Sequence, residues 1–138
     1  MACPFCTLIA APERTHVVLD DPAALAFLDR RPVFLGHVLV VPRDHVETLG
    51  DLPAERVGTF FRCVQRVTRG VEDGMAAAGT FVAINDKVSQ SVPHLHVHVV
   101  PRRPKDGLRG FFWPRMKYAS DEEAAATAAR IRAAVRPE

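Results

Sequence analysis

The sequence has few cysteines, no long apolar run and no secretory signal, the features that mark secreted disulfide-rich proteins and membrane proteins. Its 138 residues include only three cysteines, one tryptophan and one tyrosine, and three cysteines are too few for the disulfide framework of a small secreted protein. No apolar run approaches the roughly 20 residues that span a bilayer. The N-terminus lacks the basic start and long apolar stretch of a secretory signal. These absences predict a cytoplasmic protein with no membrane partner.

Neither sign of charge dominates the composition. Lys and Arg number 18 against 16 Asp and Glu, a net charge of +2 with neutral histidine, so there is no general reason to expect nucleic-acid binding. Internal repeats, low-complexity tracts and long linkers are also lacking. Because 48% of the residues are hydrophobic, we expect a single domain over residues 1–138 with an ordinary core.

Five stretches of β-forming residues are bounded by turn residues. Two short stretches flank the turn at Asp20–Pro22, and a longer one is interrupted at Gly36 and His37 and closed by Pro42. The last stretch ends at Pro101. The predicted strands are 15–19, 24–28, 33–41, 80–84 and 94–100.

Two helices are also expected. The longer one follows Pro53, a residue suited to a first helical turn, and keeps apolar residues at helical spacing until Gly79 stops it. Ser120 and Glu123 form a capping-box pattern that opens an alanine-rich helix to about Val135. Together with the strands, these helices predict an α+β fold with an antiparallel sheet.

The stretch HLHVHVV, residues 94–100, places three histidines at strict two-residue spacing. On a strand, His94, His96 and His98 would share one face while the apolar residues between them fill the other. A solvated strand face or a chance metal-binding cluster is the plainer interpretation. Three histidines in register with apolar residues favour a reactive site instead, since imidazole serves as nucleophile, acid, base or ligand.

Cysteine usage raises a second question. From the residues alone, the pair Cys3-x-x-Cys6 has three interpretations: redox chemistry, a zinc site, or small apolar residues in a core. Cys63, on the flank of the long helix, is expected to be a small buried apolar residue.

These motifs together resemble the histidine triad (HIT) family. The similarity covers about residues 3–102, and it implies a HIT-like fold: a five-stranded antiparallel sheet with one long and one short helix, usually assembled as a homodimer. Residues 103–138 would then be a C-terminal lid and helix. The stretches that resemble family features, in the expected order, are 3–6, 36–45, 90–92, 94–100 and 101–102.

The resemblance implies an enzyme that hydrolyses or transfers nucleoside monophosphates through a nucleotidyl-histidine intermediate. His96 would be the nucleophile that attacks the α-phosphorus, while His98 and Ser91 would hydrogen-bond the phosphate oxygens. His94 would orient the nucleophile, and His37 matches a further active-site histidine.

Other nucleotide contacts are implied in the same way. Asp29 matches the residue that accepts hydrogen bonds from the ribose hydroxyls, Asn85 matches a phosphate-side asparagine, and Gln90 lies beside Ser91 at the nucleotide site. Two departures stand out. The loop after Asn85 lacks the glycines usual in the family, and Arg30 replaces an apolar residue that packs near the base.

The family resemblance also bears on the cysteines. His45 and His94 match positions that complete a Cys2His2 site with Cys3 and Cys6 in the zinc-containing bacterial members, a closed set typical of structural zinc. The His94 ring would then turn away from the other two triad histidines, and Pro93 would break the strand to allow this.

Residues 101–117 carry six cationic residues against Asp106, with the aromatic residues 111–113 among them. A nucleic-acid patch and a solvated loop are both open interpretations. The resemblance favours a lid that reaches toward the partner's active site, and we expect no nucleic acid as a partner.

The expected function is that of a dimeric hydrolase acting on a purine nucleoside phosphoramidate or a related AMP conjugate. A dinucleoside polyphosphate hydrolase is the alternative within catalysis. A non-catalytic nucleotide-binding or scaffold protein is the alternative outside it, and the presence of His96, His98 and Ser91 argues against that class.

Overall fold

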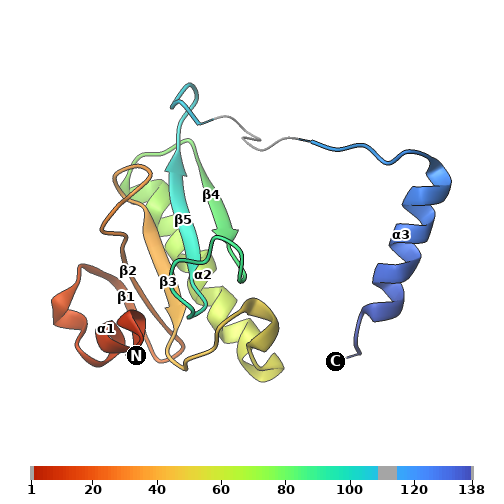
Figure 1. Ribbon diagram of the computed structural model, residues 1–138. Helices are drawn as coiled ribbons and strands as arrows, with labels where there is room; N and C mark the ends of the chain where they lie inside the picture. Colours follow the sequence, from red (N-terminus) through yellow and green to blue (C-terminus); the bar gives the residue numbers. More distant parts are fainter. Residues whose placement is uncertain (1, 109–114, 138) are drawn as a thin grey trace. The chain divides into compact units, whose positions relative to one another are not determined.

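A computed structural model describes residues 2–108 and 115–137. The contacts of the chain divide it into two units, residues 1–106 and 107–138. The first unit contains a sheet with helices on both faces (Figure 1). Within the described residues, no helix is long and apolar enough to cross a membrane.

The sheet is antiparallel and five-stranded, in the order β1-β2-β3-β5-β4. This confirms the predicted α+β class. His98 pairs with Leu39 on one side and with Ala83 on the other, so this histidine lies well inside the sheet. The strands are β1 (Val17–Asp21), β2 (Ala24–Leu28), β3 (Val38–Pro42), β4 (Gly79–Ile84) and β5 (Val97–Arg102).

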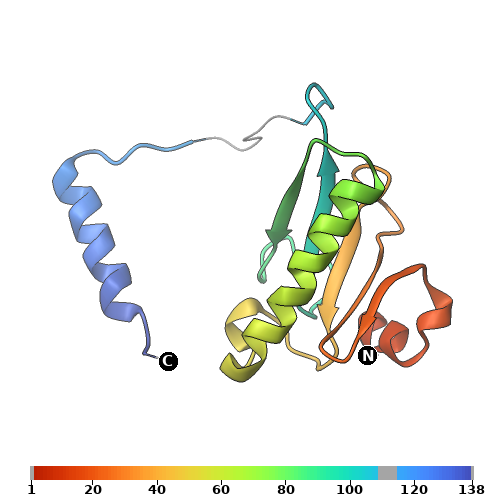
Figure 2. The ribbon, with the colours of Figure 1, turned by 180° about the vertical axis from the view of Figure 1, so that it is seen from behind.

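Each face of the sheet is covered by a different helix. The long helix α2 (Ala54–Gly74) lies diagonally across one face (Figure 2), and alternate residues of β2, β3 and β5 form the main core with it. The short helix α1 (Pro4–Ala10) contributes Phe5 to a second core on the opposite face. That second core contains Phe5, Leu25, Phe27, Leu39 and Val41.

Several predicted boundaries were wrong, including those of β1, which spans Val17–Asp21 rather than residues 15–19. β3 begins at Val38 rather than at residue 33, because residues 33–37 form a turn in which Gly36 takes φ +95° and the His37 amide donates to the Phe34 carbonyl. β5 begins at Val97, so its two preceding histidines lie outside the strand. α2 ends at Gly74 rather than being stopped by Gly79, which is the first residue of β4.

The second unit contains α3 (Asp121–Ala134), close to the predicted helix. The Ser120 hydroxyl accepts from the Glu123 amide, while the Glu123 carboxylate accepts from the amide of Ala119. No residue of α3 is buried. The aromatic residues 111–113 of the expected lid lie outside the described residues, so the lid and the single domain over 1–138 stay predictions.

Candidate active site and metal centre

A cleft of about 510 Å³ opens on the α1 face of the sheet. Its lining includes three of the predicted site residues, Ser91, His96 and His98, and the core residues Phe27 and Leu39. Helix α1 and the end of β2 with the residues that follow it also contribute to the lining. The remaining lining residues are Pro4, Phe5, Leu8, Thr15, Leu28, Asp29, Arg30, Arg31 and Val92.

His96 presents a free nitrogen to this cleft. Its Nδ1 lies 2.8 Å from the carbonyl oxygen of His94, and a carbonyl can only accept, so Nδ1 carries the proton and Nε2 keeps its lone pair. The ring is 3% exposed and packs edge-on against Phe5 at 5.1 Å between ring centroids. A buried imidazole with an unprotonated Nε2 is suited to nucleophilic attack.

His98 is held in the opposite tautomer. The Val33 amide donates to Nδ1 of His37 at 3.1 Å, so the proton of neutral His37 must be on Nε2. That Nε2 lies 3.0 Å from Nδ1 of His98 and donates to it. His98 therefore carries its own proton on Nε2, where it can donate a hydrogen bond to a ligand. The two rings lie side by side, 5.0 Å between centroids, and the available Nε2 carries a lone pair in His96 and a proton in His98.

Burial keeps the imidazoles of His37 and His98 neutral. It is the main cause that lowers the pKa of His98 to about 4, and the neighbouring His96 and His37 lower it further. Burial also lowers the pKa of His37, against an opposing effect of the Asp29 carboxylate. Neutral rings are what the tautomer assignment requires at physiological pH.

Asp29 stands at the end of β2 next to this pair. Its Oδ2 lies 3.6 Å from Nε2 of His37, and its Oδ1 accepts a 2.8 Å hydrogen bond from the Arg31 amide. The side chain is partly exposed within the cleft. Asp29, His37 and His98 thus form one polar group next to His96.

The other predicted nucleotide contacts are Ser91, Asn85 and Gln90, and only Ser91 lines the cleft. Ser91 is exposed in the cleft, whereas Asn85 is exposed outside its lining. The Gln90 amide donates to the Glu47 carbonyl and accepts from the Lys87 amide. Gln90 therefore holds the loop in place through its side chain.

The glycine-free loop after Asn85 takes a costly conformation. Lys87 and Ser89 adopt φ of 67° and 60°, the left-handed region that side chains disfavour. The Gln90 side chain offsets part of that cost, because it accepts from the Lys87 amide within the loop and donates to the Glu47 carbonyl outside it. The shorter loop seen in the sequence is thus accommodated without glycine.

A second cluster lies at the N-terminus of α1. Cys3 is the N-cap of this helix and Cys6 lies in its first turn, His45 follows β3, and His94 precedes β5. Cys3 Sγ is 3.5 Å from Nδ1 of His94, and Cys6 Sγ is 3.4 Å from Nδ1 of His45 and 3.6 Å from that of His94. All four ligand atoms lie within 4.8 Å of one another.

This donor set fits a tetrahedral zinc ion. Bonds of about 2.0–2.3 Å at tetrahedral angles separate neighbouring ligand atoms by roughly 3.5 Å, which matches the observed distances. His94 Nε2 donates to the Pro42 carbonyl at 2.9 Å, so Nδ1 is free to bind metal and the ring is fixed from behind. Burial and the adjacent Cys3 raise the pKa of Cys6, and a bound cation would oppose that rise.

The prediction that the three histidines share one strand face was therefore wrong, because His94 and His96 precede β5. The expected turn of the His94 ring toward the cysteines is confirmed by its contacts with Cys3, Cys6 and His45. Cys63 is 3% exposed within the main core, as expected.

Sequence reasoning missed two contributors to the site. The Val33 amide acts through its backbone, and the only signal for it was Gly36, which marks the turn that brings residue 33 to His37. Phe5 packs against His94 and His96; its signal was the helical spacing of apolar residues after Pro4 in α1.

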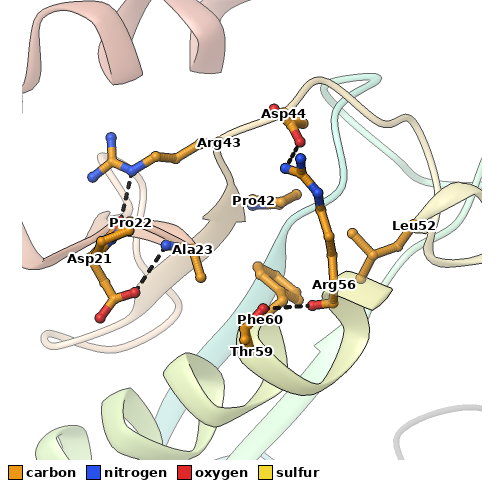
Figure 3. A pocket seen from close by; sticks show the side chains of 10 residues that line it. All are labelled: Asp21, Pro22, Ala23, Pro42, Arg43, Asp44, Leu52, Arg56, Thr59 and Phe60. Carbon is orange, nitrogen blue, oxygen red and sulfur yellow. Dashed lines mark hydrogen bonds and ion pairs between the residues drawn. The ribbon is translucent and has the colours of Figure 1, made fainter. Parts of the chain in front are cut away.

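A separate pocket of about 340 Å³ contains none of the predicted residues (Figure 3). Phe60 and Leu52 line its interior, and its charged side chains are already paired: Arg56 with Asp44, and Arg43 with the Asp21 backbone. The remaining charges have partners outside the lining, Arg43 with Asp20 and Asp21 with Arg66, so the histidine cleft is the stronger candidate for a reactive site.

Comparison with known proteins identifies relatives of this chain. An uncharacterized HIT-like protein of Mycobacterium tuberculosis is 38% identical over 110 residues, 78% of this chain and 76% of that protein. The asymmetrical bis(5'-nucleosyl)-tetraphosphatase of Schizosaccharomyces pombe is 34% identical over 97 residues, which are 69% of this chain and 53% of that protein.

Solved structures agree with the fold. A HIT family protein from Bacillus subtilis superposes with a TM-score of 0.89 at 29% identity, covering 100% of both chains. A zinc-bound histidine triad protein from Mycobacterium smegmatis has a TM-score of 0.72 at 34% identity, with 98% and 99% coverage. The HIT domain family matches residues 11–105, and the chain therefore belongs to the HIT family.

Proposed function

We propose that this protein is a nucleotide hydrolase or transferase that cleaves purine nucleoside phosphoramidates, or related AMP conjugates, at the α-phosphorus through a nucleotidyl-histidine intermediate. The observation that carries the proposal is the pair of opposite tautomers: Nε2 of His96 has a lone pair, and Nε2 of His98 has a proton. A nucleophile and a hydrogen-bond donor then face the same phosphate.

Attack by His96 Nε2 on phosphorus expels the leaving group, which takes up a proton, and leaves the nucleotide bonded to nitrogen. Negative charge on the phosphoryl oxygens would be stabilised by the His98 N–H and the Ser91 hydroxyl. The Nδ1–H of His96 continues to donate to the His94 carbonyl, so the ring remains oriented throughout the reaction. Water then attacks the phosphorus and releases the nucleoside monophosphate.

Other residues of the cleft support nucleotide binding. Asp29 offers a carboxylate next to the catalytic pair, suited to accepting hydrogen bonds from ribose hydroxyls. Asn85 and Gln90, the other predicted contacts, belong to the loop before Ser91, and in this proposal they shape the phosphate side.

Cys3, Cys6, His45 and His94 would hold a structural zinc ion. When bound, the ion would link α1 to the segments around β3 and β5 and would have no open coordination position. Its link to the reaction is His94, whose backbone carbonyl fixes His96. We further propose that the protein acts as a cytoplasmic homodimer, as the family resemblance implies.

A second candidate function is hydrolysis of dinucleoside polyphosphates. The relative from Schizosaccharomyces pombe carries the name of such an enzyme, and the same nucleophile would serve. A panel of AMP amides, AMP-lysine and dinucleoside polyphosphates compared by kcat/KM would rank the two candidates.

The decisive test is His96→Asn. We expect turnover to be abolished and nucleotide binding to stay within about tenfold, roughly 1.4 kcal/mol, because only the covalent step is lost. Brief mixing of wild-type protein with substrate, followed by acid-free denaturation and mass measurement, should trap a nucleotidyl adduct that the variant lacks. Turnover by the variant at the wild-type rate would reject His96 as the nucleophile, and absence of both adduct and turnover in the wild type would favour a binding protein.

A further inference from the structure

One rim of the histidine cleft carries charge that neither the phosphate site nor the metal centre uses. Arg30 and Arg31 line the cleft directly after Asp29, and both are exposed. Among the ion pairs of the described residues, none involves either guanidinium. The cleft therefore offers two unpaired cations at this rim.

The backbone fixes where this rim begins. The Arg31 amide donates to Oδ1 of Asp29, which folds the chain back on the end of β2. Oδ2 of the same carboxylate is 3.6 Å from His37, which in turn contacts His98. The arginine rim thus starts one residue away from the catalytic polar group.

A nucleotide with its phosphate at His96 and His98 must place the rest of its atoms along the remaining lining. Asp29 is the carboxylate beside this pair, and in the proposed function it accepts hydrogen bonds from the ribose hydroxyls. What remains of the lining is largely apolar, with the rings of Phe5 and Phe27, and its charged groups are the two arginines; Thr15 adds one hydroxyl. A flat purine suits the apolar surface, and its polar edge would then meet the guanidinium groups.

Guanidinium groups discriminate between purines because they only donate hydrogen bonds. Guanine and hypoxanthine present two acceptors, O6 and N7, which a guanidinium can contact together. Adenine presents N7 next to an amino group that is itself a donor. A donor-only rim therefore favours a 6-oxopurine and disfavours a 6-aminopurine.

We propose that Arg30 and Arg31 make the cleft selective for nucleotides of 6-oxopurines, guanine or hypoxanthine, over those of adenine. The reaction in this inference rests on the proposed function, but the base preference belongs to the cleft itself. It narrows the purine class and shifts the preferred substrate away from AMP conjugates.

The test compares guanosine and adenosine 5'-phosphoramidates of the same amine. Wild-type kcat/KM should favour the guanosine compound by about tenfold, roughly 1.4 kcal/mol. The double variant Arg30→Leu/Arg31→Leu should reduce this ratio to near one, mainly by losing activity on the guanosine compound. Arg69→Leu, which removes an exposed arginine of α2, is the matched control and should keep the wild-type ratio.

Binding of GMP and AMP, measured by calorimetry, separates this inference from the proposed reaction. Preferential GMP binding that disappears in the double variant supports the base preference even if neither phosphoramidate is cleaved. Cleavage of both compounds at equal kcat/KM by the wild type would overturn it. So would an equal loss for both bases in the double variant, or a loss confined to dinucleoside polyphosphates, since either would assign the arginines to an anionic group.

Discussion

Two clusters of residues of metal-ligand type occur in the described part of the chain, and their hydrogen bonds suit them to different roles. Cys3, Cys6, His45 and His94 form one, and Asp29, His37 and His98 form the other. Both contain two histidines with ligand atoms within 4.8 Å. Residue type and distance alone would assign a metal to each.

The backbone group behind one imidazole distinguishes them. The Pro42 carbonyl accepts a hydrogen bond from Nε2 of His94, which leaves Nδ1 of His94 free to bind a cation. Behind His37 lies the Val33 amide, which donates and so forces the proton onto Nε2, the nitrogen that faces His98. A metal there would have to displace that proton. The first cluster is thus suited to metal, and the second to a chain of hydrogen bonds.

The largest expected effect comes from the first cluster. Purified protein should contain about one zinc per chain, and Cys3→Ser/Cys6→Ser should remove it. Loss of a structural ion that links three segments should lower stability by about 3 kcal/mol or more, and Tm by roughly 10 °C. Elemental analysis and thermal unfolding measure both quantities.

Two variants serve as controls for this experiment. Cys63→Ala removes a buried cysteine outside the cluster, and His37→Gln changes the second cluster; both should retain one zinc. Two zinc ions per chain in the wild type, one of them lost in His37→Gln, would contradict the distinction between the clusters.

The second cluster should affect catalysis instead. His37→Leu removes the donor to Nδ1 of His98, so the His98 ring no longer has a fixed tautomer. We expect kcat to fall by about 10- to 100-fold with a smaller change in KM and with unchanged zinc content. His37→Gln, whose amide nitrogen can reach the position of Nε2, should recover part of the loss. Equal kcat in the leucine and glutamine variants would argue against control of the tautomer.

This contrast also separates what the sequence predicts from what it leaves open. β-forming residues bounded by turn residues predicted the strands of an antiparallel sheet, and helical spacing of apolar residues predicted α2, because both patterns depend on residue type. The five-stranded arrangement followed from the family resemblance. The direction of the His94 ring toward Cys3 and Cys6 followed from the family resemblance. The Val33 amide could not be predicted, since every residue has an amide and only the turn at Gly36 decides where it points.

A substitution of Gly36 should have an effect of intermediate size. Its φ is +95°, and a Cβ would lie 2.6 Å from Cγ of Met75, so Gly36→Ala combines backbone strain with a steric clash. We expect a loss of about 1–2 kcal/mol in the free energy of unfolding and a reduced kcat, because the turn carries both Val33 and His37.

The zinc content of Gly36→Ala should be unchanged, since the first cluster is not part of this turn. The double variant Gly36→Ala/Met75→Ala removes the clash but not the strain, and it should recover only part of the stability. Full recovery would show that the positive φ has no role, and loss of zinc would show that the two clusters are coupled.

The smallest expected effect is a dependence of stability on pH. The pKa of His98 is lowered to about 4 in the folded protein from about 6.5 in the unfolded chain. Between these values the unfolded state binds the proton first, so stability is fully present above pH 6.5 and is lost as the pH falls toward 4. Because the ring is only partly buried and solvent screens it, we expect a loss of about 1 kcal/mol. Urea unfolding of the wild type and of His98→Gln at pH 7 and pH 4.5 measures the difference.

The His98→Gln variant should lose less stability between these pH values, while His16→Gln, which replaces an exposed histidine, should follow the wild type. Identical pH dependence in all three proteins would mean that the hydrogen-bonded pair of His37 and His98 does not resist protonation, and the distinction between the two clusters would lose its electrostatic basis.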